Sequence, residues 1–110
     1  MTTYNFGDIV LIGFPHTSQS EMAKRPALVI YDSADNDLLL ARVTSQRYTS
    51  QSDYRIIDWQ DAGLILESYI RLGKLATIEK KYVLRLLGRL QKQEQDKALS
   101  ILKDIVCGGY

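Results

Sequence analysis

Arg25, Thr44 and Ser45 are the residues of this chain whose types and places best suit chemistry on a phosphodiester. Arg25 directly precedes one run of strand-forming residues, 26–31, and Thr44 ends a second run, 38–44. If these runs pair as an antiparallel hairpin, Arg25 and Thr44 become neighbours at the same edge. A guanidinium can bind two non-bridging phosphate oxygens and stabilise their charge in the transition state, while a hydroxyl orients the scissile group.

The same residues also fit structural tasks. Thr44 and Ser45 suit the capping of a turn, because their hydroxyls can bind nearby backbone groups. Arg25 suits an ion pair with Asp32 or Glu21, and structural ion pairs are a common alternative to an active site. Spacing alone leaves the catalytic and the structural interpretations open.

The residue inventory offers little for other kinds of catalytic site. The chain has one histidine, His16, and one cysteine, Cys107, so it can form neither a Cys/His zinc cluster nor an internal disulfide. It contains no Gly-rich phosphate loop, no nucleophile elbow and no pair of metal-spaced histidines. The sequence therefore predicts no metal and no cofactor.

The elements that must position Arg25 and Thr44 are short strands joined by polar loops. Apolar or alternating runs bounded by Gly, Pro, Asp, Asn and Ser predict strands. The polar segments 16–24 and 45–52 have no periodicity and predict loops. The predicted strands cover residues 9–14, 26–31, 38–44, 54–57 and 68–78.

The period of the apolar residues changes after Thr77. Apolar residues three and four apart predict an amphipathic helix over 82–90, weakened by Gly88, and a second helix over 93–106. Strands followed by helices in 110 residues indicate one small α+β domain spanning 1–110. We expect a strongly curved sheet or partly open barrel with the C-terminal helix packed on it.

Composition and charge indicate an ordinary folded protein with one basic region. Hydrophobic residues make up 45% of the chain and charged residues 25%. The apolar runs are far shorter than the ~20 residues of a membrane span, and the N-terminus lacks a leader pattern, so we expect a cytoplasmic protein. Net charge is only +1, yet residues 41–92 hold ten Lys or Arg against five acids. That excess suits a polyanionic partner, although cations dispersed over a solvated face would give the same count.

Four stretches of the sequence together resemble the MazF/PemK family of toxin endoribonucleases from bacterial toxin–antitoxin pairs. In chain order they read GDIVLIGFP, KRPALVIYD, ARVTSQ and SYIRLGKLATIEKKYVLRLLGRL. The resemblance covers residues 6–106, nearly the whole chain. Its most specific parts are Arg-Pro-Ala-Leu-Val, Val-Thr-Ser and Lys-Leu-Ala-Thr-Ile.

The resemblance implies a fold, an activity and partners. The fold would be the curved antiparallel sheet, or SH3-like barrel, of the CcdB/MazF toxins. The protein would be a homodimer that cuts single-stranded RNA at short sequences without a metal ion. Its cognate antitoxin would cross the RNA site with a C-terminal segment.

The resemblance also implies roles for individual residues. Arg25 and Thr44 correspond to the catalytic positions, where the RNA 2'-hydroxyl attacks the neighbouring phosphorus, Arg25 stabilises the charge and Thr44 holds the phosphate. Because arginine is essentially never deprotonated, the general base stays unassigned. Tyr48 and Tyr54 are candidates for stacking on unpaired bases, with a core or dimer role as the alternative. Further RNA contacts are expected from Lys24, Ser45, Gln46, Arg71 and His16.

One departure from the family pattern keeps a second function open. Some relatives carry an acid two residues after the arginine that corresponds to Arg71, and here that position is Gly73. A carboxylate that could serve as the base is therefore absent. The alternative is a cleavage-deficient family member that acts as a binding module, or that inhibits a protein target such as DNA gyrase, as CcdB toxins of the same fold do.

Overall fold

The computed structural model describes residues 2–15 and 22–108. These residues form six β-strands, one short 3-10 helix and one α-helix. In chain order the elements are β1 (Asp8–Pro15), β2 (Met22–Asp32), β3 (Asp37–Thr44), β4 (Asp53–Arg55), β5 (Tyr69–Glu79), η1 (Lys80–Tyr82), β6 (Val83–Arg89) and α1 (Lys92–Val106).

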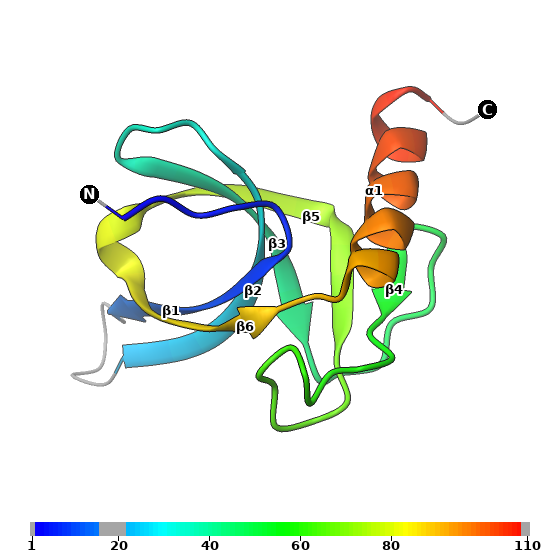
Figure 1. The fold of residues 1–110 in the computed structure, drawn as a ribbon, viewed down its shortest axis with the longest axis horizontal. Helices are drawn as coiled ribbons and strands as arrows, with labels where there is room; N and C mark the ends of the chain where they lie inside the picture. Colours follow the sequence, from blue (N-terminus) through cyan, green and yellow to red (C-terminus); the bar gives the residue numbers. More distant parts are fainter. Residues whose placement is uncertain (1, 16–21, 109–110) are drawn as a thin grey trace.

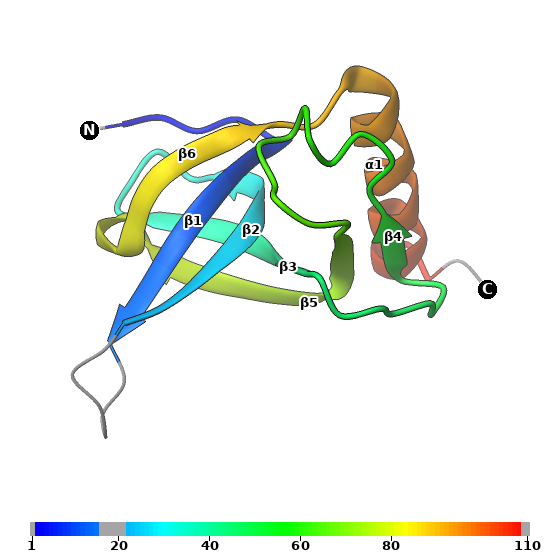
Figure 2. The ribbon, with the colours of Figure 1, turned by 90° about the horizontal axis from the view of Figure 1, so that it is seen from below.

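The strands form one antiparallel sheet in the order β4-β5-β3-β2-β1-β6. The sheet curls strongly, so that β6 comes round toward η1 and the end of β5 and leaves a partly open barrel (Figure 1). Helix α1 stands outside this curl, against β4 and β5 (Figure 2). The predicted α+β fold, a curved antiparallel sheet with a C-terminal helix, is confirmed. In the described part of the chain, no helix has the length and apolar character needed to cross a membrane.

Each face of the sheet carries its own apolar cluster, because successive side chains of a strand point to opposite faces. The cluster on the α1 side includes Leu28 of β2 and Ala98 of the helix. The cluster inside the curl includes Ala27 and Val29 of β2. Arg25 belongs to the same alternate set as Ala27 and Val29, so the packing of β2 determines the face on which Arg25 lies.

The predicted helix over residues 82–90 is wrong. Only Lys80–Tyr82 form a 3-10 turn, and Val83–Arg89 form strand β6. Strand β6 pairs with the edge of β1 that β2 leaves free, with Leu86 opposite Val10, and so satisfies backbone groups of that edge. The spacing of the leucines fits a helix, but tertiary pairing overrides a local preference of this kind.

The strands around the first loop are longer than the sequence predicted. Strand β1 reaches Pro15, and β2 begins at Met22. The rest of the predicted loop, residues 16–21 with His16, lies outside the described residues. Arg25 therefore lies within β2, where it pairs with Ile12 of β1, and its backbone is held by the sheet.

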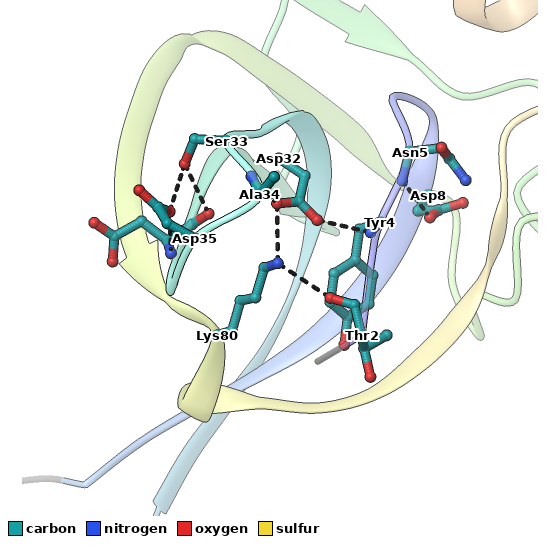
Figure 3. A network of polar contacts seen from close by, with 10 residues as sticks. Thr2, Tyr4, Asn5, Asp8, Asp32, Ser33, Ala34, Asp35 and Lys80 are labelled. Carbon is teal, nitrogen blue, oxygen red and sulfur yellow. Dashed lines mark hydrogen bonds and ion pairs between the residues drawn. The ribbon is translucent and has the colours of Figure 1, made fainter.

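A polar network ties the N-terminal segment to η1 (Figure 3). Lys80 Nζ lies 2.9 Å from Asp32 Oδ1 and donates to the carbonyl oxygen of Thr2 at 3.1 Å. The N–H of Tyr4 donates to Asp32 Oδ2 at 2.8 Å. The hydrogen bond from Tyr4 lowers the pKa of Asp32, and Lys80 adds to this effect, while burial opposes it. Asp32 is thus engaged with Tyr4 and Lys80 rather than with Arg25.

Candidate active site

Arg25 and Thr44 lie level with each other on the neighbouring strands β2 and β3. The β2–β3 ladder ends at the pair Ala27–Arg42, and Arg25 and Thr44 each lie two residues beyond that pair. Opposed residues of antiparallel strands share a face. Both residues line one hollow of about 250 Å³, which we call the Thr44 hollow.

The Thr44 hollow combines cations, hydroxyls and an apolar rim. Lys24 and Ser45 line it beside Arg25 and Thr44, and Ser68 contributes a further hydroxyl. The connection between β4 and β5 adds the apolar segment 64–66, in which Ile65 is 89% exposed. None of the described lining residues is a carboxylate, so the hollow presents a positive surface that suits a phosphate.

The hydroxyl of Thr44 has a structural contact of its own. Its Oγ1 accepts a hydrogen bond from the N–H of Gln46 at 3.1 Å, which is the turn-capping contact that the sequence left open. This bond uses a lone pair of the oxygen, and a hydroxyl also has a proton to donate. The turn contact and a hydrogen bond to a phosphate are therefore compatible. Gln46 itself is exposed at the edge of the site.

Arg25 has no ion-pair partner among the described residues. Asp32, one of its two predicted partners, binds Lys80 instead, and Glu21 lies outside the described residues. Arg25 also borders a second hollow of about 200 Å³, together with Arg42 and Lys74. An exposed guanidinium on a strand combines a fixed backbone with a free charge, which phosphate recognition requires.

Arg71 lies on the same face but is committed to its neighbours. Its Nε lies 3.2 Å from Asp53 Oδ1, and its guanidinium stacks over the Tyr48 ring at 3.6 Å from the centroid. The Arg71 side chain is 18% exposed and that of Asp53 is 1% exposed. Burial opposes the ionisation of Asp53, but hydrogen bonds from Ser50 and Arg71 outweigh it and lower the pKa of the carboxyl. Arg71 thus fixes β4 and its loop and does not line the Thr44 hollow.

Of the two tyrosines considered for base stacking, one is buried. Tyr54 is 8% exposed, and its hydroxyl donates to Glu94 Oε1 at 2.7 Å. Burial, with the adjacent Glu94 carboxylate, raises the pKa of Tyr54. Stacking of Tyr54 on a base is therefore excluded in this arrangement, whereas Tyr48 is half-buried and keeps a place at the surface.

Glu94 is a positioning residue that the sequence reasoning missed. Besides the Tyr54 hydroxyl, it accepts hydrogen bonds from the N–H groups of Ile57 at 2.7 Å and Asp58 at 3.1 Å. Glu94 is 2% exposed, and its carboxylate anchors the start of the connection whose later part, 64–66, lines the Thr44 hollow. The available signal was its place on the apolar stripe of α1, four residues before the buried Ala98.

The described residues do not assemble a metal site. No three of their histidine, cysteine, aspartate or glutamate side chains gather closely enough to hold a metal ion.

The family comparison identifies the group of proteins to which this sequence is related. Residues 5–106 match the family model described as PemK-like, MazF-like toxin of type II toxin–antitoxin system. The chain belongs to this toxin family. A comparison with curated proteins gives no match.

Solved structures of MazF-type toxins share the fold. An endoribonuclease in complex with its cognate antitoxin, from a mycobacterial species, is 16% identical, with a TM-score of 0.74 and 96% of each chain covered. The toxin MazF-mt6 of Mycobacterium tuberculosis is 15% identical, with a TM-score of 0.72, and the match covers 91% of this chain and 96% of that one. MazE-MazF from Deinococcus radiodurans gives 13% identity, a TM-score of 0.77, and 94% and 96% coverage.

In this PemK/MazF-like toxin, Gly73 is an exposed residue of β5. A Cβ at this position would meet Ser52 Oγ at 3.0 Å, a contact that a small movement of a flexible side chain can relieve. The fold therefore has space for a side chain at position 73, although the sequence places no carboxylate there.

Proposed function

We propose that this toxin is an endoribonuclease that cuts single-stranded RNA at specific short sequences without a metal ion. The observation that carries the proposal is that Arg25 of β2 and Thr44 of β3 line one hollow, whose described lining has cations and hydroxyls but no carboxylate. The activity of the similar mycobacterial endoribonuclease supports it.

The proposed reaction is an internal displacement at phosphorus. The RNA 2'-oxygen forms a bond to the adjacent phosphorus, the bond from phosphorus to the 5'-oxygen breaks, and a cyclic phosphate and a 5'-hydroxyl result. Arg25 binds the non-bridging oxygens, and the Thr44 hydroxyl donates to one of them as negative charge grows. The 2'-hydroxyl proton leaves to a base that is not Arg25, since arginine stays protonated, and the departing 5'-oxygen takes up a proton from solvent water to become the 5'-hydroxyl.

The proposed partners follow from the same family membership. We propose that two copies form a homodimer, that a cognate antitoxin covers the RNA site and that the protein acts in the cytoplasm. The exposed leucines of the edge strand β6, Leu84 and Leu86, are apolar surface available to a protein partner.

The decisive experiment is incubation of the purified protein with a long single-stranded RNA in excess EDTA, followed by mapping of the 5' ends. We expect discrete cuts from the parent and none from Arg25→Ala or Arg25→Lys, because lysine lacks the fork that binds two phosphate oxygens. Arg85→Ala is the matched control, since it removes an exposed arginine from β6, away from the Thr44 hollow. Size-exclusion chromatography of the parent should give the mass of a dimer.

Two results would contradict the proposal. A folded Arg25→Ala protein that cuts as fast as the parent would remove Arg25 from the mechanism. A folded parent that makes no cuts would remove the endonuclease activity itself. Melting temperatures of all variants establish that each is folded.

A binding module is the second candidate, and Gly73 is the observation that favours it. Neither the described lining of the Thr44 hollow nor position 73 supplies a carboxylate that could act as base. If the folded parent makes no cuts, Gly73→Asp tests whether this missing group is the cause. Cleavage restored by Gly73→Asp would identify the parent as a toxin that has lost its catalytic base.

A further inference from the structure

A row of opposed residues continues from the candidate active site to the far edge of the sheet. Thr44 of β3 pairs with Tyr69 of β5, and Tyr69 pairs with Arg55 of β4. With Arg25 beside Thr44 in the lining of the Thr44 hollow, the row crosses β2, β3, β5 and β4 on one face. Two strand spacings, about 10 Å, separate Thr44 from Arg55, so a strand of RNA bound at Thr44 can reach β4 with a neighbouring nucleotide.

A polar hollow of about 340 Å³ lies at the end of this row, and we call it the Glu67 hollow. Its volume is in the range of small-ligand sites. Arg47 and Arg55 supply positive charge, Thr49 and Ser50 supply hydroxyls, and Tyr48 supplies an aromatic ring. A mixture of cations, hydrogen-bonding groups and an aromatic ring matches the parts of a nucleotide better than it matches an apolar side chain.

Glu67 is the carboxylate of this hollow that is both fixed and open. Its Oε1 lies 2.9 Å from Arg55 Nε and accepts the Tyr69 hydroxyl at 3.3 Å. The described residues make no hydrogen bond to its Oε2, and the side chain is 46% exposed. A carboxylate held on one oxygen presents the other as an acceptor, which suits an N–H donor of a ligand.

The aromatic wall is fixed as well. The Arg71 guanidinium lies over the Tyr48 ring, and Arg71 is in turn bound to the buried carboxylate of Asp53. Tyr48 is thus held in place at the Glu67 hollow, where its ring can contact the flat face of a base.

We propose that the Glu67 hollow holds the nucleobase beside the cleaved bond, and that Glu67 selects a base with an exocyclic amino group, namely adenine, cytosine or guanine over uracil. The amino group donates to Glu67 Oε2, since carboxylates read bases by accepting from such donors. Arg55 and Arg47 balance the flanking phosphates. The inference rests on the proposed endoribonuclease function, to which it adds the residue that determines sequence preference.

The test compares cut sites in a randomised single-stranded RNA for the parent, Glu67→Gln and Glu79→Gln. An amide at position 67 can donate to the O4 of uracil, so we expect Glu67→Gln to lower the preference for an amino-bearing base at one position next to the cut by about tenfold, the scale of one lost base-reading contact. Glu79→Gln should keep the parent's preference. It removes an equally charged, exposed glutamate that pairs with Lys81 at the opposite end of β5.

The outcomes separate the inference from the proposed function. Unchanged base preference in a folded, cleaving Glu67→Gln protein would overturn the inference and leave the endoribonuclease proposal intact. A parent that does not cleave would contradict the proposed function. In that case, filter-binding selection from the same RNA pool tests the inference. The sequences retained by the parent are compared with those retained by Glu67→Gln. Identical retained sequences would overturn the inference.

Discussion

At the scale of single residues, Thr44 has two tasks that substitution can separate. Its Oγ1 caps a turn at Gln46, and its proton is proposed to bind phosphate. Thr44→Val keeps the shape and removes the hydroxyl, so we expect RNA cleavage to fall by about 100-fold, as for the loss of one transition-state hydrogen bond. The free energy of unfolding should change by only about 1 kcal/mol, the value of one ordinary hydrogen bond. Single-turnover cleavage and urea unfolding measure the two effects. Thr44→Ser keeps a hydroxyl and should stay active. A Thr44→Val protein that cuts at the parent's rate would contradict the proposed phosphate contact of Thr44.

At the scale of elements, a substitution of Gly88 tests whether this segment forms strand β6 or the helix that local spacing favours. A Cβ at position 88 would lie 2.4 Å from the carbonyl oxygen of Ala62, so Gly88→Ala should destabilise the protein by about 1–3 kcal/mol, the usual cost of overpacking. In a helix the same change would stabilise by about 1 kcal/mol. The sign of the change in urea unfolding decides between them. Gly73→Ala is the control, because its Cβ would meet only the flexible side chain of Ser52, and it should change stability little.

At the scale of the whole molecule, two buried carboxylates link the stability of the sheet to pH. Asp32 and Asp53 both have pKa values lowered from the usual 3.8, so the unfolded chain binds their protons more tightly than the folded protein does. Their contribution to stability is complete above the unfolded pKa of about 4 and is lost as pH falls through the lower folded values. The urea concentration at the midpoint of unfolding should therefore decrease when the pH is lowered below 4. An Asp32→Asn, Asp53→Asn double variant should show a shallower drop, and a drop as steep as the parent's would contradict this account.

The sequence by itself determined the parts of the protein that depend on local pattern. Apolar runs bounded by turn residues placed 26–31 and 38–44 on adjacent strands, and the antiparallel direction then brought Arg25 and Thr44 to one hollow. The apolar stripe over 93–106 was enough for α1, because a period near 3.6 over four turns has no competing strand interpretation. The motifs that resemble the toxin family are also local stretches of sequence, and the residues that carry them form the sheet and its edge.

Only the tertiary structure decided the features that depend on distant partners. Leucines over 82–90 fit a helix or a strand, and the free edge of β1 selected the strand. Tyr54 entered the core because Glu94, forty residues away, accepts its hydroxyl. Arg71 became a support of β4, and Glu67 came to line a hollow with Tyr48, because strand order brought these residues together. A local pattern determines the face on which a residue lies, whereas the packing of the whole chain determines which residue it contacts on that face.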